Sequence, residues 1–154
     1  MDEEEEFQKA KSSAIRMLAF RARSTQEISD RLHRKGISAS LTQRVVNYLN
    51  EYGYLDDQAF AQQWAKSLVV NKGWGFARIK VDLRSRGISP DLAEETIARL
   101  RKDHSEEETA RRILGKRFSH LDLRKISPKD KNRLIRFFQS RGFSWETILR
   151  VVRI

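Results

Sequence analysis

The sequence predicts an all-α protein made of three tandem three-helix repeats, each helix-turn-helix-like, that form an elongated, curved array. The first observation behind this prediction is compositional: 154 residues contain only two prolines and seven glycines. Abundant Leu, Arg, Glu, Gln and Ala favour helix throughout. The second observation is a repeat, because Gly36, Gly87 and Gly142 lie in similar surroundings, 51 and 55 residues apart. Strand-type alternation of apolar and polar residues is sustained nowhere.

An apolar stripe precedes each of the three glycines. Ile28 and Leu32 lie eight and four residues before Gly36, and the same two positions in the other copies are held by Ile79, Leu83, Leu134 and Phe138. Residues four apart share one face of a helix. The pattern therefore predicts one amphipathic helix before each glycine, with this pair buried.

Helix ends and helix starts also repeat. A basic residue followed by glycine is typical of a helix C-terminus, because the cation complements the dipole and glycine adopts the left-handed conformation. The serines two residues after each glycine predict N-caps of the next helix. Residues 24–27, 105–108 and 127–130 have the form of a capping box and predict further helix starts.

The remaining helices complete each unit. Earlier helices are predicted over residues 13–22, 60–70 and 109–118, and a surface loop over 119–127. No unit has enough core to be robust alone, so we expect neighbours to share apolar surface. The predicted organisation is an acidic, disordered segment followed by three three-helix repeats, over residues 1–11, 12–55, 56–104 and 105–154.

The charge is unevenly distributed. The chain has 31 basic and 21 acidic residues, a net charge of +10, and five of the acidic residues lie within the first six positions. Residues 111–154 hold 13 basic and 3 acidic side chains. A basic excess concentrated in this way attracts polyanions and speeds encounter with them. We therefore expect a nucleic acid or a nucleoprotein assembly as partner, rather than a merely solvated surface.

The residues needed for common catalytic sites are missing. There is no cysteine, the three histidines lack metal-ligand spacing, and no glycine-rich phosphate loop is present. Asp56 and Asp57 fit a helix start better than a metal site. The acidic N-terminus is unlike a secretory signal, and no apolar run is long enough to span a bilayer. We expect a cytoplasmic protein that is not an enzyme, binds no cofactor or metal and does not associate with membranes.

Several segments together resemble one known family. Residues 53–61, Gly-Tyr-Leu-Asp-Asp-Gln-Ala-Phe-Ala, resemble a signature of the RecX regulators, and residues 75–83 resemble that family's next helix, with Phe76 in place of the usual proline. Residues 131–148 are similar to its final repeat. Each segment alone is weak, whereas their order and spacing over residues 12–154 are specific.

The resemblance implies a function. RecX proteins bind the RecA filament on single-stranded DNA, in its groove or at its end, and limit filament growth. RecA's ATP hydrolysis, strand exchange and SOS coprotease activity fall as a consequence, which affects DNA repair and homologous recombination. We therefore expect a protein that binds RecA filaments and contacts single-stranded DNA without sequence preference. We also expect a monomer.

The candidate binding residues are basic side chains outside the apolar stripes, together with one tryptophan. The tryptophan lies between two glycines in a polar turn, where it could be exposed and stack on a base. The candidates are Arg31, Arg34, Lys35, Lys72, Trp74, Arg78, Lys80, Arg84, Arg86, Lys129, Lys131, Arg133, Arg136 and Arg141.

Two other functions are compatible with the sequence. The first is a helix-turn-helix regulator that acts directly on nucleic acid. The third helix of unit one offers polar groups for base contacts at Thr42, Gln43, Arg44 and Asn47, whereas unit two offers Asp91, Glu94 and Glu95, which phosphates would repel. The second is a helical scaffold that binds an acidic protein without nucleic acid.

Overall fold

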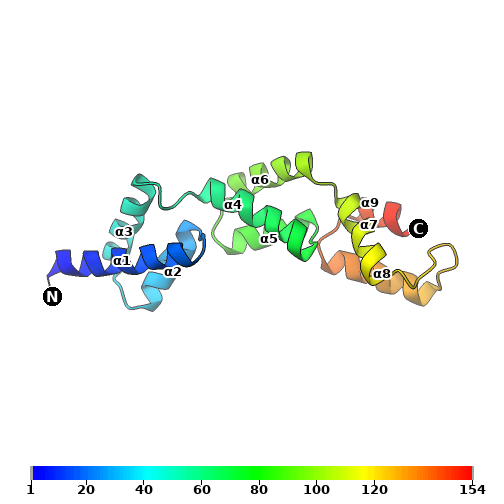
Figure 1. Ribbon diagram of the computed structural model, residues 1–154, viewed down its shortest axis with the longest axis horizontal. Helices are drawn as coiled ribbons and strands as arrows, with labels where there is room; N and C mark the ends of the chain where they lie inside the picture. The colour runs from blue at the N-terminus through cyan, green and yellow to red at the C-terminus, as the bar shows by residue number, and fades with distance from the viewer. Residues whose placement is uncertain (1, 154) are drawn as a thin grey trace.

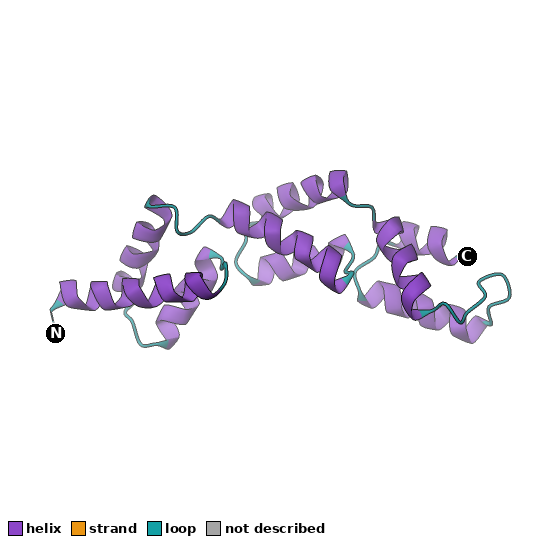
Figure 2. Cartoon of the chain, viewed as in Figure 1, coloured by secondary structure: helices purple, strands orange, loops and turns teal. Residues whose placement is uncertain are grey.

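The computed structural model describes residues 2–153, and it confirms the predicted fold class. Figure 2 shows helices joined by loops, with no strand in this part of the chain. Three units of three helices follow one another in an elongated, slightly bowed row, with the two ends of the chain at opposite ends of the row (Figure 1). None of the helices described is long and apolar enough to cross a membrane.

Unit 1 contains α1 (Glu3–Phe20), α2 (Thr25–Arg34) and α3 (Ala39–Glu51). Helices α1 and α2 both pack against α3. The predicted stripe of α2 is fully buried, with Ile28 and Leu32 each 0% exposed. Ser24 and Glu27 form the predicted capping box at the start of α2.

The N-terminal segment differs from our expectation of a disordered segment over residues 1–11. Helix α1 begins at Glu3, ten residues before the predicted start at residue 13. The Asp2 carboxylate accepts a hydrogen bond from the N–H of Glu5, and four glutamates occupy the first turn, where the helix dipole favours negative charge. Phe7 and Ala10 extend the apolar stripe and are buried in the unit 1 core. The acidic residues therefore start a helix.

Unit 2 contains α4 (Asp57–Ser67), the π-helix η1 (Leu68–Lys72), α5 (Phe76–Ser85) and α6 (Pro90–Asp103). The sequence predicted one helix over residues 60–70. The structure instead widens after Ser67 into the π-helix, which ends at Gly73 with a left-handed φ of 65°. A π-turn of this kind has no simple sequence signal.

Unit 3 contains α7 (Glu106–Arg117), α8 (Pro128–Ser140) and α9 (Trp145–Val152). The connection between α7 and α8 is irregular, as predicted for residues 119–127. Leu134 and Phe138 of α8 are fully buried.

The repeated glycine turns have the predicted geometry. Gly36, Gly87 and Gly142 have φ values of 86°, 84° and 87°. In each turn the N–H after the glycine donates to a carbonyl five residues earlier, at 3.1 Å. Each serine that follows caps the next helix with its side chain, as predicted for Ser38, Ser89 and Ser144.

The cores of the units are separate, which differs from the shared apolar surface that we expected. The buried apolar residues form three clusters, and each cluster lies within one unit. Three amphipathic helices of this length close their apolar stripes on one another. The contacts that join neighbouring units therefore lie outside these three clusters, and they decide which basic side chains are available for a partner.

Candidate functional site

Units 1 and 2 meet where the turn between α5 and α6 packs against the start of α2; we call this contact the first junction. The hydroxyl of Ser24 donates to the carbonyl of Arg86 at 2.6 Å. The turn lies so close that a Cβ on Gly87 would be 2.2 Å from the Cβ of Gln26. The N–H of Thr25 also donates to the carboxylate of Asp57 at 2.8 Å, which links α2 to the start of α4.

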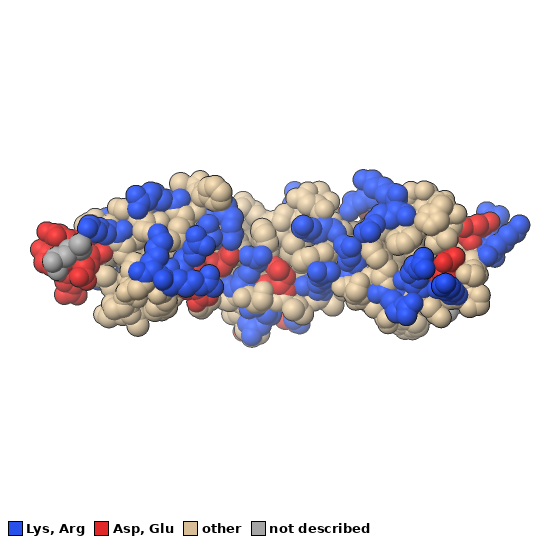
Figure 3. Space-filling model, turned by 90° about the horizontal axis from the view of Figure 1, so that it is seen from below, with Lys and Arg blue, Asp and Glu red and all other residues tan. Residues whose placement is uncertain are grey.

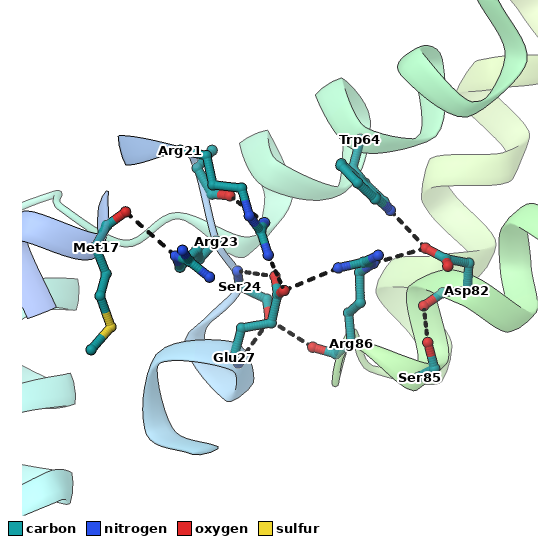
Figure 4. Close-up of polar contacts among 10 residues, drawn as sticks. Met17, Arg21, Arg23, Ser24, Glu27, Trp64, Asp82, Ser85 and Arg86 are labelled. Carbon is teal, nitrogen blue, oxygen red and sulfur yellow. Dashed lines mark hydrogen bonds and ion pairs between the residues drawn. The ribbon is translucent and has the colours of Figure 1, made fainter. Parts of the chain in front are cut away.

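The side chain of Arg86 crosses the first junction (Figure 4). Its Nη1 lies 3.0 Å from Glu27 Oε2 in unit 1, and its Nε lies 2.9 Å from Asp82 Oδ2 in unit 2. Its guanidinium carbon is 4.1 Å from the ring centroid of Trp64, whose indole N–H donates to Asp82 at 2.6 Å. The sequence predicted Arg86 as a partner-binding residue. In the structure its charge is satisfied within the protein, so it serves to join the units.

Glu27 is the carboxylate at the centre of this network. Besides Arg86 it pairs with Arg21 at 2.9 Å. Burial pushes the pKa of Glu27 upward, but the backbone N–H of Ser24 and the charges of Arg21 and Arg86 outweigh burial, so that the pKa lies below its ordinary value. Glu27 therefore remains an anion at neutral pH.

Units 2 and 3 meet where the turn between α8 and α9 packs against the start of α5; we call this contact the second junction. Here backbone meets backbone: the N–H of Gly75 donates to the carbonyl of Arg141 at 2.7 Å, and that of Ala77 donates to the carbonyl of Gly142 at 3.2 Å. A Cβ on Gly75 would lie 2.4 Å from the carbonyl carbon of Gly142. Only glycine permits this approach.

Glu106 of α7 completes the second junction. Its Oε1 accepts the N–H of Phe76 at 2.7 Å, so it caps α5, which begins at a glycine without a capping side chain. Its Oε2 accepts from the N–H of Ser144 at 3.3 Å and from the hydroxyl of Thr147 at 3.0 Å. The carboxylate of Glu106 thus links the start of α5 to the start of α9 through hydrogen bonds.

The predicted site residues of unit 1 lie together at the end of α2. Arg31, Arg34 and Lys35 are exposed. Lys35 donates to the hydroxyl of Ser13 at 2.7 Å. None of the ion pairs among residues 2–153 involves Arg31 or Arg34, so both guanidinium groups face solvent without a carboxylate partner.

More of the predicted site residues of unit 2 than of unit 1 contact other groups of the protein. Trp74 is half-buried against the unit 2 core, with the guanidinium carbon of Arg78 3.9 Å from its ring centroid, so that it is less open to a base than the sequence suggested. Lys80 pairs with Glu94. Arg84 is exposed and donates to the carbonyl of Ile88 at 2.7 Å, and Lys72 is exposed at the end of η1.

The predicted site residues of unit 3 lie on α8 and at its end. Lys129, Arg133 and Arg136 are exposed and Lys131 is half-buried. Arg141 follows α8, and its guanidinium carbon lies 4.7 Å from the ring centroid of Phe137. Burial, and then repulsion from Arg117 and Arg78, lower the pKa of Arg141.

Arginines are concentrated at both junctions, and three of them were not among the site residues predicted from the sequence. Arg21 and Arg23 precede α2 beside the first junction, and Arg117 ends α7 beside the second. They were missed because they lie outside the repeated stripes. The density of arginine between residues 16 and 34 was a signal that could have found the first two. Figure 3 shows basic side chains over one face of all three units, whereas acidic side chains are densest at the N-terminal end.

The groups that base reading through α3 would need are engaged within unit 1. Thr42 is buried, with 2% of its surface exposed. Gln43 donates to Asn47 at 2.8 Å. Arg44 pairs with Glu4 at 3.0 Å, and its guanidinium carbon lies 4.1 Å from the ring centroid of Phe7. Within residues 2–153 no group of three or more His, Asp or Glu side chains could hold a metal ion.

The comparisons with known proteins agree with this arrangement. Family models described as the first, second and third three-helix domains of RecX match residues 10–49, 56–97 and 105–152. Regulatory protein RecX of Pelodictyon phaeoclathratiforme is 32% identical over 146 residues, which cover 94% of this chain and 88% of that protein. Regulatory protein RecX of Clostridium perfringens strain 13 is 29% identical over 152 residues, which cover 97% of this chain and 70% of that protein.

A solved structure shares the fold. The crystal structure of RecX from Lactobacillus salivarius superposes with a TM-score of 0.80 at 22% identity and covers 97% of this chain and 96% of that one. The three family domains coincide in order with the three structural units. The chain belongs to the RecX family of regulatory proteins.

Proposed function

We propose that this protein is a negative modulator of RecA, which binds the RecA filament on single-stranded DNA and limits its growth. RecA's ATP hydrolysis, strand exchange and SOS coprotease activity then fall, while the protein itself acts in the cytoplasm as a monomer, without catalysis. The observation that carries the proposal is the elongated row of three basic units in a RecX family member. A row of this shape suits a long, negatively charged nucleoprotein helix better than a small ligand.

The free cations support contact at more than one point along such a filament. Arg31 and Arg34 lie in unit 1 beside the first junction, and Lys129, Arg133 and Arg136 lie on α8 of unit 3. Contacts that far apart would follow either the filament groove or an end of the filament with its emerging strand. Non-specific attraction to the DNA phosphates adds to the contacts with RecA.

The deciding experiment measures ATP hydrolysis by RecA on single-stranded DNA while this chain is titrated. We expect hydrolysis to fall, and to fall less at high salt, because screening weakens contacts between exposed charges. The triple reversal Lys129→Glu, Arg133→Glu, Arg136→Glu should weaken inhibition. The control Glu95→Gln, on the exposed acidic face of α6, should leave it unchanged. Unchanged hydrolysis at a large excess of the chain would contradict the proposal.

Direct base reading is the weaker candidate. The polar groups of α3 that it needs are buried or paired with neighbours, and Glu4 lies beside them. A scaffold for an acidic protein would be favoured if the chain bound its partner equally well after removal of DNA.

A further inference from the structure

A polar cavity of about 350 Å³ opens beside the first junction. Five arginines line it: Arg21, Arg23, Arg31, Arg34 and Arg86. Only two carboxylates, Glu27 and Asp30, share the lining, so the cavity carries an excess of three positive charges. Figure 4 shows Arg21 and Arg23 beside Glu27, with Arg86 reaching it from unit 2.

Two of the five arginines are neutralised within the protein. Arg21 and Arg86 both pair with Glu27, at 2.9 Å and 3.0 Å. These contacts hold the two guanidinium groups and the carboxylate in place, so that Glu27 offers little net repulsion to another anion. Asp30 accepts a hydrogen bond from the amide of Gln26 at 2.8 Å.

The other three arginines are not neutralised. Arg23, Arg31 and Arg34 take part in none of the ion pairs found within residues 2–153. The Nε of Arg23 donates only to the carbonyl of Met17, at a long 3.4 Å. Burial, and then repulsion from Arg21 and Arg31, lower the pKa of Arg23. Guanidinium groups gathered in this way without an anion repel one another.

We propose that this cavity is a phosphate-binding pocket, in which Arg23, Arg31 and Arg34 bind the phosphate groups of a nucleotide chain or a free nucleotide. A guanidinium group offers planar pairs of N–H donors that match phosphate oxygens, and an incoming anion relieves the repulsion among the three arginines. The volume lies in the range of ordinary ligand sites. Because the lining is almost entirely charged, it suits a phosphate better than an apolar ligand.

The pocket rests on the contact with DNA phosphates in the proposed function, but its test contains the purified chain and no RecA, so the two proposals can fail separately. Binding of a fluorescent oligothymidylate is measured by anisotropy over a range of salt, and binding of ATP by NMR of the arginine Nε–H signals. The variant Arg23→Gln, Arg31→Gln, Arg34→Gln should bind the oligonucleotide roughly two to three orders of magnitude more weakly in 50 mM salt. The slope of log K against log salt should fall by about 2, as expected when three phosphate contacts to a single strand are lost.

A matched control removes the same charge elsewhere. The variant Lys66→Gln, Arg99→Gln, Lys102→Gln neutralises three exposed cations of α4 and α6 that lie outside the candidate binding residues, and it should lose much less affinity. The double variant Arg31→Gln, Arg34→Gln changes only exposed side chains and keeps the test valid if the half-buried Arg23 is needed for folding.

The outcomes separate the two sources of phosphate. Loss of oligonucleotide binding alone, with no shift of the arginine signals by ATP, identifies the strand backbone as the ligand. Shifts of those signals by ATP that disappear in the variant identify a free nucleotide. Equal losses from the pocket variant and the control variant on α4 and α6, or no loss from either, would overturn the proposal.

Discussion

The two junctions occupy equivalent positions in the repeat but are built from different groups. In each, the glycine turn of one unit packs against the start of the second helix of the unit before it. Ser24 begins that helix at the first junction, and Gly75 begins it at the second; each lies twelve residues before its unit's own glycine turn. At the first junction a side-chain hydroxyl contacts the turn, whereas at the second the backbone of Gly75 contacts it directly.

The arginine before the turn glycine differs in the same way. Arg86 pairs with two carboxylates and lies over Trp64, so the first junction is held largely by charge. Arg141 contributes its backbone carbonyl to the second junction, while its side chain lies over Phe137. The same repeat can thus be joined either by ionic side chains, which respond to pH and salt, or by close backbone packing, which responds to side-chain volume.

The largest effect is expected from adding volume at the second junction. Gly75→Ala keeps an ordinary backbone conformation, since φ is −77°, but places a Cβ 2.4 Å from the backbone of Gly142. The junction must open, and we expect a loss of about 1–3 kcal/mol in the free energy of unfolding. Denaturant unfolding measures the loss, and small-angle scattering should show a changed arrangement of units 2 and 3.

Gly115→Ala is the control for this change. Gly115 lies within α7, and nothing lies within 4 Å of an added Cβ. Alanine there should stabilise the helix by about 0.5–1 kcal/mol. If Gly75→Ala were as stable as wild type, close backbone packing would not be what joins units 2 and 3.

A smaller effect is expected from removing charge at the first junction. Arg86→Met deletes the contacts with Glu27, Asp82 and Trp64 and leaves Arg21 as the partner of Glu27. Because these groups are partly exposed, we expect a loss of about 1 kcal/mol in unfolding free energy. Hydrogen exchange of the Thr25 N–H should become faster, while that of the Gly75 N–H, at the other junction, should not.

Arg111→Met controls for the loss of an ordinary surface pair. Arg111 pairs with Glu107 one helical turn away, and the Arg111 side chain is exposed while Glu107 is half-buried. Its removal should cost about 0.5 kcal/mol or less. Equal losses from the two variants would show that Arg86 adds nothing by linking two units.

The smallest effect concerns pH. The pKa of Glu27 is lower in the folded chain than its ordinary value of 4.5. Ionised Glu27 therefore stabilises the fold at pH values above its unfolded pKa. This contribution is lost as the pH falls through the folded pKa, which lies below 4.5. The stability gap between wild type and Glu27→Gln, measured by denaturant unfolding, should therefore close in acid. A gap that stays constant from neutral pH to pH values well below 4.5 would contradict the role given to Glu27.

Much of this protein was determined by its sequence alone. The class of fold, the glycine turns and the serine caps were predicted correctly, because each depends on residues within a few positions of one another. Helix α1 was predicted too short, since its acidic first turn was judged by composition, although Phe7 and Ala10 continue the apolar stripe.

Only the tertiary structure decided which charges are free. Arg31 and Arg86 are alike as residues on basic faces, yet Arg31 is left exposed while Arg86 is paired across a junction with a residue 59 positions away. In the same way Gly75 marks a helix start in the sequence, and only the approach of Gly142 shows why it must be glycine. The contacts between units join residues far apart in the chain, and no local pattern encodes such distances.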